Sequence, residues 1–261
     1  MKYSLHNIVS ISYLKKADEI YIPYKDRRAI PDYAKKYPKT ALVLEVPPAT
    51  QWEFDELKEY YILSRERLTL CLPDMLDPRI EQIKSAGIPF FWGYTITSFY
   101  ELQTLVNFGV SQARIGAPIF FDTNALKKFN ITKRVIANVA HEGYIPGADG
   151  IVGSWIRPED VDQYEGAIDI LEFADSKSHK EEALYRIYAE QHAWPGKVDM
   201  IITNIYAPLA YNRMLPPEFT TARLNCRQRC MSGGACQLCH RYIKLADPEL
   251  IKNYMETIQN N

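Results

Sequence analysis

The sequence lacks an excess of either charge, a long apolar run and a spread of cysteines along the chain. Its 31 basic and 32 acidic residues give a formal net charge of −1, which removes bulk charge as an argument for binding nucleic acid or an anionic membrane. Lys, Asp, Pro or Arg interrupts every apolar stretch before it reaches the ~20 residues that a membrane helix needs. We therefore expect no membrane partner.

A secretion signal is also lacking, because Ser, His and Asn interrupt the weak apolar stretch at the N-terminus. Cysteine is nearly absent from the first 225 residues, where only Cys71 occurs, and the remaining four cysteines are clustered. A secreted disulfide framework spreads its cysteines to join distant segments, whereas a tight cluster is typical of a metal site in a reducing compartment. We therefore expect a cytoplasmic protein.

Short apolar runs alternate with helix-like stretches over the first 205 residues. Their near-continuous apolar character is typical of parallel strands that are buried on both faces. The eight runs are Glu19–Tyr24, Ala41–Val46, Leu68–Leu72, Pro89–Ile96, Ala113–Pro118, Arg134–Val139, Gly150–Ile156 and Ile168–Phe173. The stretches with helical spacing of apolar residues are 52–63, 78–86, 98–108 and 180–192.

This alternation predicts an α/β fold, namely a (β/α)8 TIM-type barrel over residues 1–205. Such barrels have typically ~250 residues, and a doubly wound open sheet is the structural competitor. Beyond Tyr206 the alternation of apolar runs and helix-like stretches ends. Prolines follow, and after them the cysteine cluster and a short helix-like stretch. Residues 206–261 are therefore predicted to form a small C-terminal cysteine-rich, metal-binding module.

The cysteine cluster has the spacing C-x3-C-x5-C-x2-C and begins at Cys226. Four thiolates this close in sequence can reach one soft metal centre. The compact spacing favours an iron–sulfur cluster of the 4Fe-4S type, because a cubane offers separated corners to one loop. Structural zinc is the alternative, although its usual cysteine pairs lie further apart. The four predicted metal ligands are Cys226, Cys230, Cys236 and Cys239.

Basic side chains surround these cysteines, among them Arg227 and Arg229. A centre held by four thiolates is anionic, so neighbouring cations are favoured there and tune the cofactor. The same arginines could instead bind the phosphates of a nucleic acid. We predict Arg227 and Arg229 as cofactor-binding residues and keep nucleic-acid binding as the alternative.

In a barrel, catalytic groups gather at the carboxyl ends of the strands. The candidates there are Glu45, Asn138, Arg157 and Glu172. Both glutamates interrupt apolar strands, and burying a lone carboxylate costs several kcal/mol. Each must therefore face the barrel mouth, a ligand or an arginine such as Arg134 or Arg157.

The stretch from Gly150 to Phe173 contains the turn Ile156-Arg157-Pro158-Glu159-Asp160, then Tyr164-Glu165 and Leu171-Glu172-Phe173. This segment resembles the U32 peptidase family of cysteine-ligated, iron–sulfur TIM-barrel proteins. Weaker similarities lie at 17–21, 134–138 and 185–196. The resemblance implies iron–sulfur proteins that hydroxylate RNA bases or aromatic quinone precursors as readily as they cleave peptides.

The chain departs from that family in three ways. Family members usually carry cysteines after the sixth strand, where this chain has only the stretch 140–149. They also commonly carry an arginine after the eighth strand, where this chain has Ala174-Asp175-Ser176. All four clustered cysteines lie instead in the C-terminal module. No serine, cysteine or HExxH arrangement for peptide cleavage is present in the sequence, which makes peptidase activity the weaker implication.

Two functions remain as hypotheses. In the first, the chain is an iron–sulfur enzyme or enzyme component, of hydroxylase or U32-peptidase type, whose barrel mouth binds a small-molecule, RNA or peptide substrate. A partner subunit could complete that site. In the second, the chain is a zinc-stabilised protein that binds nucleic acid or protein, and its barrel is not catalytic.

Overall fold

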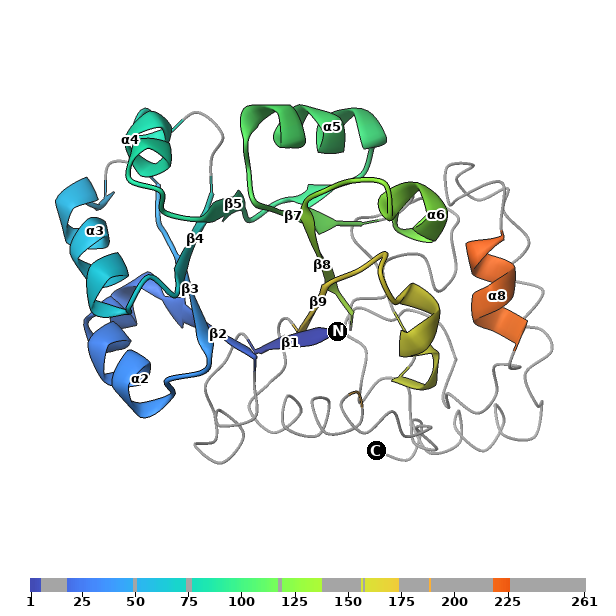
Figure 1. Ribbon diagram of the computed structural model, residues 1–261, viewed down its shortest axis with the longest axis horizontal. Helices are drawn as coiled ribbons and strands as arrows, with labels where there is room; N and C mark the ends of the chain where they lie inside the picture. Colours follow the sequence, from blue (N-terminus) through green and yellow to red (C-terminus); the bar gives the residue numbers. More distant parts are fainter. Residues whose placement is uncertain are drawn as a thin grey trace, which may run out of the picture.

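The computed structural model describes residues 1–5, 18–48, 51–73, 77–116, 119–137, 156, 158–173, 188 and 218–225. Within these ranges the chain forms a nine-stranded parallel sheet with helices on its outside (Figure 1). The strands are β1 Lys2–Leu5, β2 Glu19–Pro23, β3 Ala41–Glu45, β4 Leu68–Leu72, β5 Phe90–Trp92, β6 Thr95–Ile96, β7 Gln112–Ile115, β8 Thr132–Ile136 and β9 Ile170–Phe173.

The sheet is strongly curled. Its hydrogen-bonded order is β5-β4-β3-β2-β1-β9-β8-β7-β6, and every neighbouring pair is parallel. The strands at the two ends of this order, β5 and β6, are separated in the chain only by Gly93 and Tyr94. The two ends of the order are therefore neighbours in the chain, and Figure 1 shows the strands arranged around a centre.

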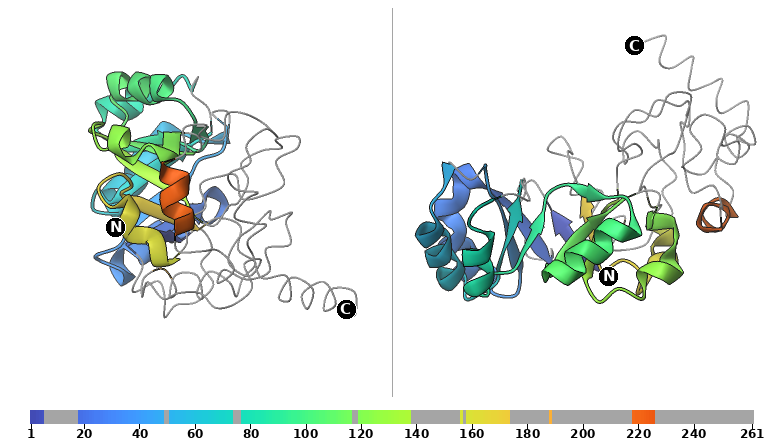
Figure 2. Two further views of the ribbon diagram at one scale, coloured as in Figure 1. Left: turned by 90° about the vertical axis from the view of Figure 1, so that its right-hand side faces the viewer. Right: turned by 90° about the horizontal axis from the view of Figure 1, so that it is seen from above.

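Helices follow most strands and cover the outer face of the sheet, as Figures 1 and 2 show. The α-helices are α2 Ile30–Lys36, α3 Phe54–Leu63, α4 Ile80–Ser85, α5 Phe99–Phe108, α6 Thr123–Leu126 and α8 Glu218–Leu224. Short 3-10 helices complete the connections, namely η1 Tyr24–Ala29, η3 Ile119–Phe121 and η4 Pro158–Tyr164.

The strands are buried on both faces, as their apolar runs predict. In β2, Ile20 and Ile22 are completely buried, and so is Tyr21 between them, apart from 1% of its surface. Successive side chains of a strand point to opposite faces, so Ile20 and Ile22 face one side of the sheet and Tyr21 faces the other. The α/β class of the fold is thereby confirmed.

The predicted helices 52–63, 78–86 and 98–108 are present as α3, α4 and α5. A capping box begins α5, because Ser98 Oγ accepts a hydrogen bond from the Glu101 amide and Glu101 Oε2 accepts one from the Ser98 amide, both at 3.2 Å. Gly109 ends it with φ of 81°, in the left-handed region that glycine adopts without strain. Gly87, with φ of 68°, follows α4 in the same way.

One predicted strand lies almost wholly outside the described residues, and one observed strand was missed. Residues 150–155 of the Gly150–Ile156 run lie outside the described residues, but β8 pairs directly with β9, with Arg134 opposite Ile170. The missed strand is β1, which pairs with β2 on one side and β9 on the other. With Lys and Ser among its four residues, β1 has too short an apolar pattern to predict a strand.

The C-terminal region is described only at residues 218–225, which contain α8. Thr221 Oγ1 donates a hydrogen bond to Gln163 Oε1 at 3.4 Å, so α8 contacts η4. The predicted helix 180–192 is described only at Tyr188, and the boundary at residue 206 stays a prediction. Within the described ranges, no helix combines the length and the apolar character required to cross a bilayer.

Candidate functional site

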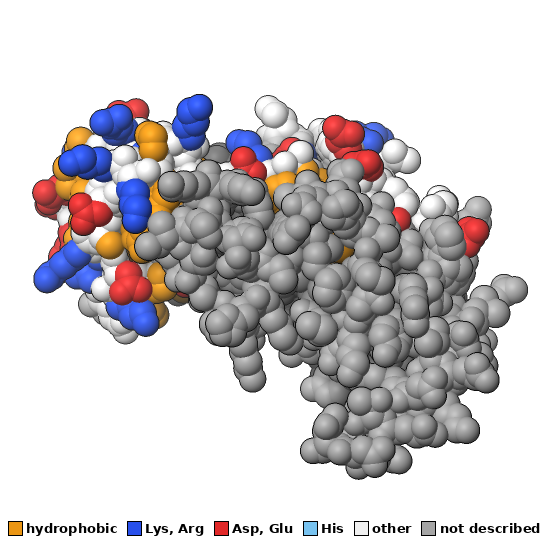
Figure 3. Space-filling view, turned by 90° about the horizontal axis from the view of Figure 1, so that it is seen from below, with side chains coloured by type: hydrophobic (Ala, Val, Ile, Leu, Met, Phe, Trp, Pro, Cys, Tyr) orange, Lys and Arg blue, Asp and Glu red, His pale blue; other side chains and the backbone are white. Residues whose placement is uncertain are grey.

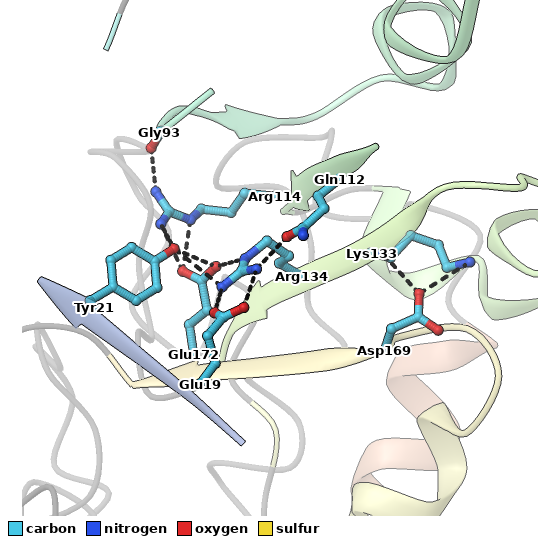
Figure 4. Close-up of polar contacts among 9 residues, drawn as sticks. All are labelled: Glu19, Tyr21, Gly93, Gln112, Arg114, Lys133, Arg134, Asp169 and Glu172. Atoms are coloured by element: carbon cyan, nitrogen blue, oxygen red, sulfur yellow. Dashed lines mark hydrogen bonds and ion pairs between the residues drawn. The ribbon is translucent and has the colours of Figure 1, made fainter. Parts of the chain in front are cut away.

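Glu172 of β9 lies at the centre of a buried ionic network on the inner face of the sheet (Figure 4). Its side chain has no exposed surface. Oε1 accepts hydrogen bonds from the Tyr21 hydroxyl at 3.0 Å and from Nε of Arg134. Oε2 accepts one from Nε of Arg114 at 2.9 Å and forms an ion pair with Nη2 of the same guanidinium at 2.7 Å. Both oxygens of the carboxylate are therefore engaged by cations.

Arg134 of β8 joins this carboxylate to a second one. Its guanidinium donates to both oxygens of Glu19, with Nη1 3.2 Å from Oε2, and Nη1 also donates to Oε1 of Gln112. With Arg114, the network contains two guanidinium groups and two carboxylates, and its formal charge is zero. This balance explains how four charged groups can be buried together, since a single buried charge without a partner is strongly unfavourable.

Arg114 of β7 extends the network across the inner face. Nη2 donates to the Tyr21 hydroxyl at 3.1 Å, and Nη1 donates to the carbonyl oxygen of Gly93, between β5 and β6. The ring of Phe91 lies beside both guanidinium groups, with its centroid 4.5 Å from Cζ of Arg134 and 5.8 Å from Cζ of Arg114. The aromatic face and the carboxylates together hold the two cations in place.

The curl of the sheet is what brings these residues together. Tyr21 lies on β2 and Arg114 on β7, four positions away in the strand order. In a flat sheet such strands would be about 19 Å apart, at about 4.8 Å per step. The 3.1 Å hydrogen bond between the two side chains therefore requires the sheet to bend around them.

The network also shifts the pKa values of its members. Burial raises the pKa of the Tyr21 hydroxyl well above its usual value, and the adjacent Glu172 carboxylate raises it further. Burial alone would lower the pKa of Arg114 and Arg134, but the facing carboxylates outweigh it and the pKa of each guanidinium is raised. Tyr21 is thus neutral and both arginines are cationic throughout the physiological range.

Cys71 of β4 lies next to this network, at the carboxyl end of its strand. Burial raises the pKa of the Cys71 thiol to about 12, although Arg114 opposes the shift. Gly93 leaves room for the sulfur, because a Cβ at residue 93 would lie 3.2 Å from Cys71 Sγ. Cys71 is therefore a buried, neutral thiol, as expected for a small core residue rather than a nucleophile.

Glu45 lies at the carboxyl end of β3, directly opposite Cys71 in the register with β4. Unlike Glu172, it is exposed. Among the described residues, no hydrogen bond or ion pair joins Glu45 to the buried network. Two glutamates that look alike in the sequence therefore occupy different environments, one at the rim of the sheet and one in its interior.

The structure places two of the predicted site residues. It brings Glu172 together with Arg134, one of the two arginines that the sequence suggested as partners, and it leaves Glu45 apart from them. The other predicted site residues lie outside the described residues: Asn138, Arg157, Arg227, Arg229, Cys226, Cys230, Cys236 and Cys239. Among the described residues, no group of three or more His, Cys, Asp and Glu is placed to hold a metal.

Sequence reasoning missed four members of the network, which are Glu19, Tyr21, Gln112 and Arg114. A signal for them was present, because Gln112 and Arg114 lie two residues apart on β7, and Glu19 and Tyr21 lie two apart on β2. Polar side chains at a spacing of two share one face of a strand. Which strands face each other across the interior is not visible in the sequence.

The outer surface carries charges of both signs. In the view of Figure 3, Lys and Arg side chains alternate with Asp and Glu over the described part of that face. This distribution agrees with the balanced composition of the chain and gives no large single-sign surface on that part of the view.

No family model matches the chain, and no curated protein matches it. Similar solved structures include a designed cube-shaped, porous protein cage made by fusing symmetric oligomeric domains, at 13% identity and a TM-score of 0.46, over 73% of this chain and 72% of that one. A monomeric form of phosphoribosylanthranilate isomerase from Thermotoga maritima has 11% identity and a TM-score of 0.44, over 73% and 98% of the two chains. A glycerol uptake operon antiterminator-related protein from the same organism has 11% identity and a TM-score of 0.39, over 69% and 96%. Similarities at this level assign no function.

Proposed function

We propose that the chain is an iron–sulfur enzyme or enzyme component, similar to the U32 peptidase family, that acts at the mouth of a (β/α)8 barrel. The observation that carries this proposal is the cluster of four cysteines with the spacing C-x3-C-x5-C-x2-C. The substrate classes that fit the resemblance are an RNA base, an aromatic precursor or a peptide. A reducing compartment such as the cytoplasm would keep the thiolates available.

Closure of the barrel is part of this proposal. It is supported by the order of the strands, whose two ends are β5 and β6 and are joined by Gly93 and Tyr94. It is also supported by the hydrogen bonds that cross the interior from β2 to β7. Read as one interrupted strand, β5 and β6 would complete an eight-membered cylinder that begins with β1.

The donor set fits a soft metal centre by its chemistry. Cys226, Cys230, Cys236 and Cys239 would supply four thiolates, the ligand type of iron–sulfur clusters. Arg227 and Arg229 would offset the negative charge of the thiolate-bound centre. When bound, an iron–sulfur cluster supplies electron transfer or a coordination position for an oxygen donor.

The two glutamates have different parts in this proposal. Glu45 is exposed at the carboxyl end of β3, where it would accept a hydrogen bond from a substrate group. Glu172 is buried and paired with two arginines, so it would be a buried charged group beneath the barrel mouth. Asn138 and Arg157 are proposed to line the same edge, since Asn138 lies near the end of the predicted strand Arg134–Val139 and Arg157 follows the predicted strand Gly150–Ile156.

Analysis of iron and acid-labile sulfide in protein prepared without oxygen tests the proposal. We expect about four iron and four sulfide per chain and a brown protein with a charge-transfer band near ~400 nm. Replacing Cys226, Cys230, Cys236 and Cys239 by alanine should abolish both. The matched control is Cys71→Ala, which should keep the iron because this buried thiol lies on β4.

A colourless protein that contains zinc and no iron would overturn the redox proposal. That outcome would favour the alternative of a zinc-stabilised protein that binds nucleic acid or protein beside a non-catalytic barrel. The observation in its favour is the crowding of basic residues around the cysteines, namely Arg223, Arg227, Arg229, Arg241 and Lys244. A protein with neither metal would contradict both.

A further inference from the structure

The sheet contains one place where two adjacent strands are not joined by a backbone ladder. Among the described strands, β5 and β7 lie side by side, yet β5 is hydrogen-bonded only to β4, and β7 only to β6 and β8. We call this boundary the β5–β7 seam and define it as Phe90–Gly93 facing Ser111–Arg114. Directly after the seam, β6 pairs with β7, with Thr95 opposite Arg114.

Side chains bridge the seam instead of backbone groups. The Ser111 hydroxyl donates a hydrogen bond to the carbonyl oxygen of Phe90 at 3.4 Å. Nη1 of Arg114 donates to the carbonyl oxygen of Gly93. Both donors come from the β7 side and both acceptors from the β5 side, so each bond spans the seam.

Arg114 is held more firmly than Ser111. Its remaining guanidinium nitrogens are bound to Glu172 on β9 and to Tyr21 on β2. Separating β5 from β7 would therefore either break the bond to Gly93 or pull a buried cation away from its carboxylate, which is strongly unfavourable. A single side chain links the seam to the far side of the sheet.

We infer that the seam is where the curled sheet opens first, and that Arg114 is the side chain that holds it closed. Local opening requires least free energy where the fewest backbone hydrogen bonds must break. At every other boundary in the strand order a parallel ladder resists separation, and at the seam two side-chain bonds do so. This inference rests on the proximity of β5 and β7 and does not depend on the cysteine cluster.

Amide hydrogen exchange of the whole chain, read by mass spectrometry of peptic peptides, tests the inference. In the unmodified chain, we expect peptides covering 88–94 and 110–116 to exchange faster than peptides covering β2 and β3. The variant Arg114→Lys keeps a positive charge but removes the fork of donors that reaches Gly93. It should speed exchange at the seam about tenfold more than at β2 and β3.

Arg134→Lys is the matched control. It makes the same chemical change in a neighbouring arginine that shares Glu172, but whose other hydrogen bonds go to Glu19, Gln112 and Tyr21. It should raise exchange without preference for the seam. Equal effects of the two variants on the seam peptides would overturn the inference.

A second variant, Ser111→Ala, removes the other bridging bond and leaves every charge in place. We expect a smaller increase in exchange, confined to the same peptides. If Arg114→Lys fails to fold, Ser111→Ala decides: faster exchange at the seam supports the inference, and unchanged exchange overturns it.

Discussion

Glu172 balances the charge of two guanidinium groups in the interior of the sheet, and its contribution to stability follows from that position. It is completely buried, and its oxygens contact Arg114, Arg134 and Tyr21. An ion pair of this kind adds little stability by comparison with a well-packed apolar core, but removing one partner leaves uncompensated buried charge. Glu172 is therefore expected to be irreplaceable even by its own amide.

The variant Glu172→Gln should lower the free energy of unfolding by about 3–5 kcal/mol, because two buried arginines would share the single carboxylate of Glu19. Urea denaturation followed by fluorescence of the buried Trp92 measures the change. Glu81→Gln is the control, since Glu81 pairs with Lys84 at 3.3 Å on the surface and such pairs contribute little. Equal effects of the two substitutions would contradict the charge-balance argument.

Single elements show which local signals are sufficient by themselves. The helices α3, α4 and α5 were predictable because apolar residues at helical spacing lie within one short segment of each. A glycine also follows α4 and α5. In α5 the Ser98–Glu101 capping box and Gly109 mark both ends. Strand β1 was not predictable, because its four residues include Lys and Ser and carry too short an apolar pattern.

The variant Ser98→Ala should destabilise the protein by about 1 kcal/mol, because the Glu101 amide at the start of α5 loses its acceptor. The change is measured as a shift of the urea midpoint at constant slope. Ser98→Asp should restore most of the loss, since aspartate is an equally good capping residue. If alanine and aspartate behave alike, the cap contributes nothing measurable.

At the scale of the whole molecule, β1 connects the beginning and the end of the sheet. It lies between β2 and β9, with Ser4 opposite both Glu19 and Glu172 in register. Those two glutamates are the carboxylates of the buried network. The position of β1 therefore determines whether the halves of the network can meet.

Deleting residues 1–5 should abolish cooperative unfolding, because β2 and β9 would each lose a ladder of hydrogen bonds and the network its geometry. A thermal scan by circular dichroism would then show a broad, low-temperature change in place of a sharp transition. The substitution Lys2→Ala keeps the strand, changes only an exposed side chain and should leave the transition sharp. An unchanged melting curve after the deletion would show that β1 is dispensable.

The sequence by itself determined the α/β class, the ends of three helices and the positions of most strands. Apolar runs, caps and glycines act between residues that are neighbours in the chain, so they can be read there. Only the tertiary structure decided that β1 lies between β2 and β9, and that Glu45 is exposed while Glu172 is buried. The physical reason is that strand pairing and the buried network join residues far apart in the chain, as in the pairing of Lys2 with Ile170 and the hydrogen bond between Tyr21 and Glu172, which are 151 positions apart. No local pattern records which distant groups will meet.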